Sequence, residues 1–203
     1  MYLSYAIIAI TIILSLFALN DRLFFEKAKF NPWSIAHRNE WWRWVSGGFI
    51  HADYMHLGVN MLTLYFFGPI LESNFVGLFD VTGYFLFAVL YLLAVPFSSM
   101  YSYYKHKDDF TYSAIGASGA VSAILFGTIL FAPTSSVCLY FAICIPAWLF
   151  GILYLVYEYY MGKRQLDNIG HDAHFYGALF GLVFVIIVYP SVIPEFIGQF
   201  IGS

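Results

Sequence analysis

The chain has 203 residues, of which 61% are hydrophobic and only 10% are charged, and its mean hydropathy is +0.75. A soluble globular domain carries about 25% charged residues because its surface faces water, so this composition excludes that class and indicates a protein covered largely by lipid. The formal net charge of −3 gives no reason to expect nucleic acid or an acidic ligand as a partner.

Six apolar runs follow one another, each close to the roughly 20 residues that a membrane-spanning helix needs. The first run lacks the basic start and the small-residue cleavage site of a signal peptide, so we expect it to be a retained helix. With no repeat or low-complexity tract, residues 1–203 are expected to form a single all-α transmembrane domain. The runs are Tyr2–Leu19, Tyr54–Leu71, Val81–Phe97, Ser113–Phe131, Val137–Tyr157 and His174–Ile193.

The connection between the first two runs, Asn20–Trp44, is longer and more polar than the others. It ends in the cluster Trp41-Trp42-Arg43-Trp44, and tryptophan is enriched at membrane–water interfaces. We therefore expect this first loop to lie in the interface.

The two cysteines, Cys138 and Cys144, both fall in the fifth run. On a helix, residues at this spacing point to different faces. The interpretation as a helix therefore predicts two free, buried thiols rather than a disulfide.

All the lysine and arginine residues fall in the first, third and fifth connections between the runs. With six spans these three connections lie on one side of the membrane, and the positive-inside rule would put that side in the cytoplasm. The residues are Arg22, Lys27, Lys29, Arg38, Arg43, Lys105, Lys107, Lys163 and Arg164.

The fourth run begins with the segment Gly116-Ala117-Ser118-Gly119. Gly119, Ala123 and Gly127 recur every four residues and give one helix face without bulky side chains, which lets another helix approach closely. Ser118 lies beside this face at the start of the helix, where free backbone N–H groups can stabilise an oxyanion. Small-residue packing alone is the commoner explanation of such a motif.

The sixth run carries a second stripe of this kind, formed by Ala173, Gly177 and Gly181. His174 lies next to it near the helix start, and a neutral imidazole can accept a proton at neutral pH. Two helices with complementary small faces would bring Ser118 and His174 together, as a serine hydrolase requires. A histidine that only bonds a neighbouring helix is the structural alternative.

Three polar residues lie on the second run. His56 and Asn60 are four residues apart and share a helix face, and both side chains can donate hydrogen bonds to an oxyanion beside the Ser118 N–H. Hydrogen bonding between helices explains them equally well. Glu72, at the far end of the run, is interpreted as a structural residue that pairs or caps.

Taken together, these residues resemble the rhomboid family of intramembrane serine proteases. The resemblance runs from about Trp42 to Gly181 and follows the six-helix order. It rests on Trp42-Arg43, on His51 with His56-x-x-x-Asn60, on Gly68 and Glu72, on Gly116-x-Ser118-Gly119, and on Ala173-His174-x-x-Gly177-x-x-x-Gly181.

The resemblance implies a six-helix rhomboid-like bundle that cleaves membrane proteins through a Ser118–His174 dyad, with no acid. His56, Asn60 and the Ser118 N–H would form the oxyanion hole. Substrates would be transmembrane proteins with helix-destabilising small residues near the interface, because a helix in lipid keeps its backbone bonds satisfied. Substrate would enter near the second and fifth helices.

The chain departs from the family in one side chain and in its loop charges. Many members carry an aromatic residue one turn after the nucleophile, stacked on the base, where this chain has Ser122. His174 would then be oriented by Tyr176 or His171. The family's active site faces the extracytoplasmic side, here of a bacterial inner membrane, which is the side that carries the basic loops.

Other classes fit less well. A catalytically silent rhomboid-like protein that binds membrane clients would normally lack the serine or the histidine. A transporter would place its polar groups at broken helices near the midplane. The sequence has no His-Glu-x-x-His motif and no pair of aspartates inside two spans, so we expect neither a metal nor a cofactor. The expected partners are transmembrane substrates and the lipid bilayer.

Overall fold

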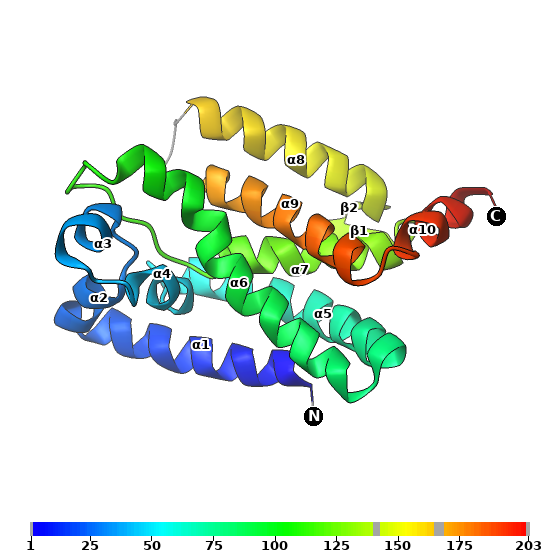
Figure 1. The fold of residues 1–203 in the computed structure, drawn as a ribbon, viewed down its shortest axis with the longest axis horizontal. Helices are drawn as coiled ribbons and strands as arrows, with labels where there is room; N and C mark the ends of the chain where they lie inside the picture. The colour runs from blue at the N-terminus through cyan, green and yellow to red at the C-terminus, as the bar shows by residue number, and fades with distance from the viewer. Residues whose placement is uncertain (1, 140–142, 165–168, 202–203) are drawn as a thin grey trace.

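A computed structural model describes residues 2–139, 143–164 and 169–201 as a bundle of helices with one small hairpin (Figure 1). Each of the six apolar runs contributes one helix of the bundle, so the expectation of an all-α membrane bundle is confirmed. These helices are α1 (Leu3–Asn20), α5 (Tyr54–Phe79), α6 (Val81–His106), α7 (Ser118–Phe131), α8 (Ala147–Arg164) and α9 (His171–Val188).

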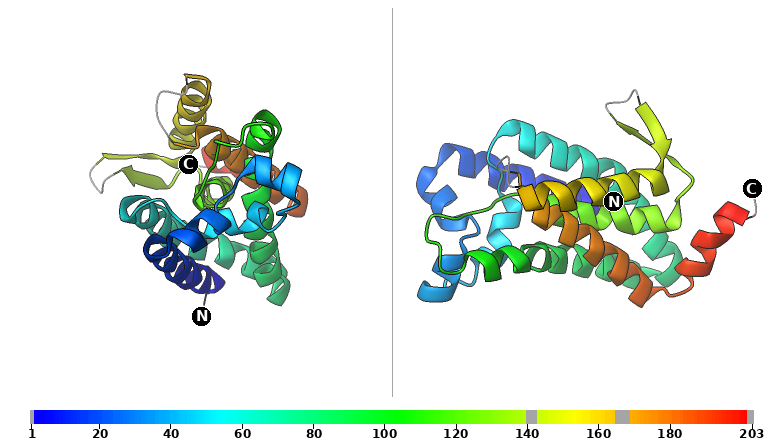
Figure 2. Two further views of the ribbon diagram at one scale, coloured as in Figure 1. Left: turned by 90° about the vertical axis from the view of Figure 1, so that its left-hand side faces the viewer. Right: turned by 90° about the horizontal axis from the view of Figure 1, so that it is seen from above.

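Among the described residues, four helices have the length and hydropathy of a membrane span, namely α1, α5, α6 and α9. The apolar α7 has 14 residues, or about 21 Å at 1.5 Å per residue, which is shorter than the ~30 Å core of a bilayer. It lies at the centre of the bundle among α5, α6 and α9 (Figure 2). Its residues from Gly119 to Leu130 are buried. α8 has 18 residues but carries Glu158, Lys163 and Arg164. The sequence thus located the six helices without distinguishing the short central one.

The first loop is folded into short helices, namely α2 (Arg22–Ala28), α3 (Pro32–Arg38), α4 (Arg43–Ser46) and the 3-10 helix η1 (Gly47–Phe49). The side chains of Asp21 and Asn31 accept backbone N–H bonds at the starts of α2 and α3. Phe30 pairs with Ala114 through two backbone hydrogen bonds of 3.0 Å, and the Gly116 N–H donates to the Gly47 carbonyl at 2.9 Å. The first loop therefore holds the segment that leads into α7.

Two expectations for the fifth run were wrong. Its first part is a hairpin of antiparallel strands β1 (Ser136–Leu139) and β2 (Ile143–Pro146), and α8 starts only at Ala147. Cys138 lies opposite Cys144 and the two form a disulfide. A spacing of six separates two residues on a helix but places them opposite each other across a short hairpin. The run is rich in β-branched and aromatic residues, which fit a strand as well as an apolar helix.

The last run also divides. α9 ends at Val188, before Tyr189-Pro190, and a second apolar helix, α10 (Val192–Ile201), follows. The residue before a proline is disfavoured in helical conformation, which explains the break.

Candidate active site

The site predicted from the sequence lies where α7 and α9 touch through their backbones. A Cβ built on Gly177 would lie 2.1 Å from the carbonyl oxygen of Gly119, and one built on Gly181 would lie 2.1 Å from that of Ala123. Only glycine allows these approaches, since real Cβ atoms do not come so near an oxygen. The structure therefore packs the two small-residue stripes against each other.

Ser118 and His174 lie beside this contact. Ser118 is the first residue of α7, His174 is in the first turn of α9, and both are partly buried. The neighbouring residues are close, because the Ala173 carbonyl oxygen is 3.3 Å from a Cβ built on Gly119. The two side chains thus belong to adjoining helix starts at the same end of the bundle.

The turn before Ser118 is held by His51, which is completely buried. Its Nε2 accepts the Ala117 N–H at 3.3 Å, and its Nδ1 lies 2.9 Å from the Ser15 hydroxyl, which donates to the Phe49 carbonyl. This chain of bonds requires a neutral ring with its proton on Nδ1. Burial in the loop before α5 lowers the pKa of His51 from 6.5 to about 4, with a smaller lowering from His56 and an opposing effect of Asp53.

Gly116 gives the same turn its shape. Its φ of +119° is one that side chains rarely allow, and a Cβ there would lie 2.5 Å from the imidazole of His56. Because glycine leaves this space free, the His56 ring lies directly against the backbone that leads to Ser118. The backbone N–H groups in the first turn of a helix such as α7 have no acceptor inside that helix. Of these groups at the start of α7, His51 accepts the hydrogen bond of Ala117 alone.

Asn60 lies one turn beyond His56 on α5 and is buried. Its side-chain amide donates to the His56 carbonyl at 2.9 Å, which uses one of its two N–H groups within the helix. The His56 backbone N–H donates to Asp53 at 2.7 Å, so its ring stands at a capped helix start. The oxyanion-hole role of both side chains stays a prediction.

His174 has two neighbours on α8 that the sequence analysis missed, Tyr154 and Glu158. Oε1 of Glu158 lies 3.1 Å from Nδ1 of His174, and Oε2 lies 2.5 Å from Nδ1 of His171. The Glu158 side chain is only 6% exposed. The predicted fifth run ended at Tyr157, one residue before it. An ionisable residue within an apolar helix was the signal that would have found it.

Tyr154 occupies the space left by the small Ser122. Its ring stacks on the His174 imidazole with centroids 6.5 Å apart and planes 26° from parallel, and its hydroxyl lies 2.8 Å from the Ser122 hydroxyl. An aromatic ring thus reaches His174 from α8 rather than from α7. Of the two residues expected to orient His174, His171 contacts it edge-on at 6.2 Å, whereas Tyr176 packs on Tyr101.

Glu158, His171 and His174 also form a group whose ligand atoms all lie within 4.8 Å of one another. Two imidazoles and a carboxylate are a donor set that suits zinc. Their side chains already bond one another, so the arrangement does not need an ion to satisfy their polar atoms.

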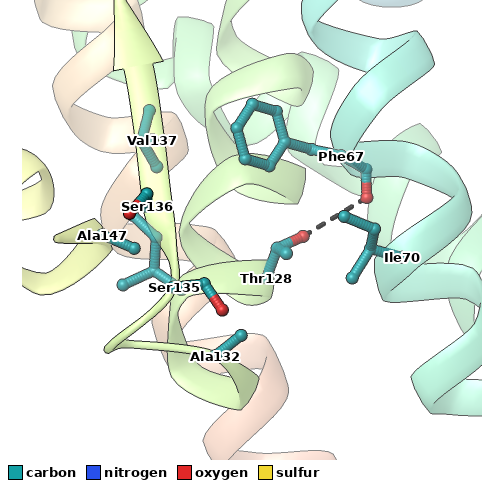
Figure 3. Close-up of a pocket in the computed structure, with 9 residues that line it drawn as sticks. Phe67, Ile70, Thr128, Ala132, Ser135, Ser136, Val137 and Ala147 are labelled. Atoms are coloured by element: carbon teal, nitrogen blue, oxygen red, sulfur yellow. Dashed lines mark hydrogen bonds between the residues drawn. The ribbon is translucent and has the colours of Figure 1, made fainter. Parts of the chain in front are cut away.

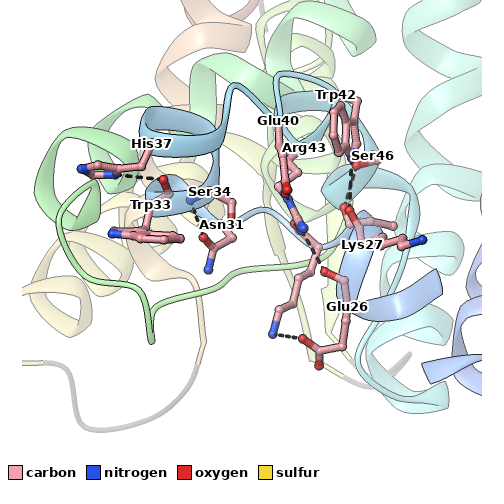
Figure 4. Close-up of polar contacts among 12 residues, drawn as sticks. Glu26, Lys27, Asn31, Trp33, Ser34, His37, Glu40, Trp42, Arg43 and Ser46 are labelled. Carbon is pink, nitrogen blue, oxygen red and sulfur yellow. Dashed lines mark hydrogen bonds and ion pairs between the residues drawn. The ribbon is translucent and has the colours of Figure 1, made fainter. Parts of the chain in front are cut away.

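Trp42 and Arg43 hold the first loop rather than the site. The backbone carbonyls at the C-terminal end of α2, and that of the next residue, accept hydrogen bonds from side chains (Figure 4). These side chains belong to α4 and to the N-cap residue of α4. Arg43 donates at 2.8 Å to the carbonyls of Glu26 and Lys29 and also pairs with Glu40. Trp42 donates to the Lys27 carbonyl and Ser46 to that of Ala28. These bonds satisfy the carbonyls that a helix end leaves unpaired.

Glu72 and Gly68 join α5 to α1. The fully buried Glu72 carboxylate accepts the N–H groups of Leu3 and Ser4 at 2.5 and 2.9 Å, so it caps the start of α1 with a charge that the helix dipole favours. A Cβ on Gly68 would lie 2.8 Å from that of Ser4. Both contacts are structural.

A pocket of about 170 Å³ lies at the other end of α7, where α5, the hairpin and the start of α8 meet (Figure 3). Its walls are mainly apolar and contain no titratable side chain, so it offers no catalytic group. The second and fifth of the six apolar runs contribute α5 and α8, and both helices border this pocket. The entry of substrates between these two helices stays a prediction. The lining residues are Phe67, Ile70, Thr128, Ile129, Ala132, Ser135, Ser136, Val137 and Ala147.

Comparison with known proteins gives a consistent family. A family model described as "Rhomboid domain" matches residues 38–191. "RHOMBOID-like protein 12, mitochondrial" from Arabidopsis thaliana is 32% identical over 142 residues, which are 66% of this chain and 42% of that protein. "Putative rhomboid protease YdcA" from Bacillus subtilis (strain 168) is 30% identical over 92 residues, which are 45% of this chain and 41% of that protein. The matched segments span about two fifths of these curated relatives.

Proposed function

Because the chain belongs to the rhomboid family, we propose that it is an intramembrane serine protease in which Ser118 is the nucleophile and His174 the general base. The observation that carries the proposal is the glycine contact between α7 and α9, which brings the helix starts with these two residues together. A serine and a histidine on adjoining helix starts can act on an acyl group without a metal or cofactor.

The chemistry follows from the groups at these helix starts. Ser118 Oγ attacks the carbonyl carbon of the scissile peptide and gives its proton to His174. The Ser118 N–H, His56 and Asn60 stabilise the negative charge on the carbonyl oxygen. His174 then gives the proton to the leaving amine as the C–N bond breaks. Water, activated by His174, hydrolyses the remaining acyl-enzyme and restores Ser118.

Substrates of this protease would be other membrane proteins. A protease binds its substrate as an extended strand, whereas a helix in lipid keeps its backbone hydrogen bonds, so segments with small, helix-destabilising residues near the interface fit best. In our proposal the site faces the extracytoplasmic side of a bacterial inner membrane. The relative from Arabidopsis is named mitochondrial, so its name does not point to the same membrane. A reporter fused to the C-terminus would test which side of the membrane the site faces.

The test uses three purified proteins in detergent, the wild type, Ser118→Ala and Ser113→Ala. Ser113 is an exposed serine at the same end of the bundle and serves as the matched control. Each is incubated with a single-span membrane protein and, separately, with a fluorophosphonate probe. Cleavage and labelling by the wild type and Ser113→Ala, both lost in Ser118→Ala, support the proposal. If the wild type neither cuts several substrates nor is labelled, a silent rhomboid-like protein that binds membrane clients takes its place.

A further inference from the structure

Two helix faces meet beside His174, and each carries a pair of residues at helical spacing. Tyr154 and Glu158 are four apart on α8, and His171 and His174 are three apart on α9, so each pair lies on one face. The Glu158 carboxylate reaches both imidazoles, at 2.5 Å for His171 and 3.1 Å for His174. It is the one carboxylate in the described part of α8.

We infer that Glu158 is a positioning residue that turns the Ser118–His174 dyad into a Ser–His–Glu triad. The inference rests on the proposed function and adds to it an acid that the resemblance to the family does not supply. Glu158 acts on His174, not on the substrate.

The hydrogen-bonding rules of the two groups carry the inference. An ionised carboxylate only accepts hydrogen bonds, so the His174 nitrogen that faces Glu158 must carry the ring's proton. That nitrogen is Nδ1. The neutral ring then has a free lone pair on Nε2, at the opposite edge, which is the form that can take the proton of Ser118. When His174 becomes charged, the Glu158 carboxylate stabilises the imidazolium without a change of position.

Burial makes the second contact of Glu158 informative. The side chain is 6% exposed, so its negative charge needs partners for both oxygens. His171, itself 3% exposed, binds Oε2 and fixes the direction of the carboxylate. With Oε2 held there, Oε1 is aimed at His174, whose side chain is 16% exposed and so remains open to a substrate.

A structural link between α8 and α9 and a metal site are the competing explanations of this cluster. A structural link predicts loss of stability in a Glu158 variant without loss of catalytic rate in the folded protein. A metal site predicts that a chelator changes the wild type. The experiment must therefore read the state of His174 directly as well as the rate.

We would compare the wild type, Glu158→Gln, Glu158→Asp and the matched control Glu72→Gln, a second buried glutamate that caps α1 instead. Histidine labelled with ¹⁵N reports which ring nitrogen carries the proton, and His174→Asn assigns the signal. The wild type should show His174 protonated on Nδ1, with no effect of EDTA. Glu158→Gln should change this signal, whereas Glu72→Gln should not.

Rates complete the test. Glu158→Gln should lower kcat and fluorophosphonate labelling at least tenfold with KM little changed, and Glu158→Asp, which keeps the charge on a shorter arm, should recover part of the rate. Glu72→Gln should lower the unfolding temperature and leave the labelling rate of the folded protein unchanged. An active Glu158→Gln with an unaltered His174 signal would overturn the inference while the proposed function stands. If the wild type neither cuts nor is labelled, the proposed function and the triad both fail, and the His174 signal still shows whether Glu158 holds the ring.

Discussion

The two sides of His174 are built from different kinds of contact. On one side α9 meets α7 through bare backbone, with Gly177 against Gly119 and no side chain between them. On the other side α9 meets α8 through the polar side chains of Glu158 and Tyr154, while only three residues of α8 are buried. The first contact sets the distance between two helices, and the second sets the orientation of one ring.

This difference explains why one side could be predicted and the other could not. A backbone contact needs small residues at a fixed spacing, and that pattern is visible in a single sequence. A contact between polar side chains depends on which residues of two neighbouring helices face each other. A single sequence does not reveal that pairing.

The α7–α9 contact should be the most sensitive feature of the molecule. In Gly177→Ala, the new Cβ would lie 2.1 Å from the Gly119 carbonyl oxygen, so the helices must separate. We expect a loss of about 3 kcal/mol in the free energy of unfolding. Labelling of Ser118 should fall about 100-fold, because displacement by about 1 Å at a catalytic pair has that effect. Thermal unfolding and probe labelling in detergent measure the two losses.

Gly77→Ala is the control for this substitution. A Cβ at Gly77 meets nothing within 4 Å, and alanine is the better helix former, so this variant should gain about 0.5–1 kcal/mol. Equal behaviour of the two variants would show that the α7–α9 contact is looser in solution than the structure describes.

The turn before Ser118 should be sensitive to acid through His51. Its pKa is lowered from 6.5 to about 4 in the folded protein, so the unfolded chain takes up the proton first as the pH falls. The stabilisation is complete above pH 6.5 and is lost as the pH falls towards 4. At about 1.4 kcal/mol per unit the loss amounts to roughly 3 kcal/mol. Unfolding temperatures between pH 7.5 and 4.5 measure it.

His51→Gln separates this effect from the other titrating groups. A glutamine amide can donate to Ser15 and accept from Ala117, as the neutral ring does, but it does not titrate. The variant should be somewhat less stable at pH 7.5 and lose less stability on acidification. A slope equal to that of the wild type would assign the acid sensitivity to another residue.

The sequence predicted the fold better than it predicted the boundaries. Six apolar runs gave six helices, because length and hydropathy are properties of one segment alone. The same measure could not separate the strands around Cys138 and Cys144 from the helix that follows, so it missed both the hairpin and the disulfide. A short apolar run carries no period that distinguishes a strand from a buried helix.

At the candidate site, the glycines that touch backbone and the contact of His171 with His174 were predicted from the sequence, whereas the two α8 residues that touch His174 were not. The loss of an aromatic residue at Ser122 was visible in the sequence, but its replacement by Tyr154 depends on how α8 packs. Glu158 lies one residue beyond the apolar run Val137–Tyr157, so the hydropathy pattern that predicted the helix does not include it. Both omissions concern side chains that act across a helix–helix gap.

The contacts of the first loop are intermediate between the backbone contact of α7 with α9 and the side-chain contact of α8 with α9, because side chains of the loop bind backbone carbonyls. Arg43→Ala removes bonds to the Glu26 and Lys29 carbonyls and leaves these groups unpaired. Hydrogen bonds to charged groups contribute about 1.5–3 kcal/mol, so we expect a loss of roughly 2 kcal/mol. Arg43→Lys should recover only part of this loss. Nη1 of Arg43 donates to both carbonyls while Nε pairs with Glu40, and lysine has a single nitrogen for all three partners.

Lys27→Ala is the control in the same loop, since the Lys27 ammonium has no partner in the described part of the chain. It should change the unfolding temperature very little. If Arg43→Ala were equally mild, the carbonyls at the end of α2 would be satisfied by water or lipid headgroups, and the first loop would not depend on its arginine.

The smallest expected effect separates the contribution of the Tyr154 hydroxyl from that of its ring. Tyr154→Phe removes the 2.8 Å bond to Ser122 but keeps the ring over His174, so it should cost about 1 kcal/mol and slow labelling about fivefold. Ser122→Ala should cost a similar amount. The double variant should cost little more than either single one, since no buried hydroxyl then lacks its partner. Tyr154→Ala removes the ring as well. If it labels as fast as Tyr154→Phe, the ring does not orient His174, and the α8 side of the site acts through Glu158 alone.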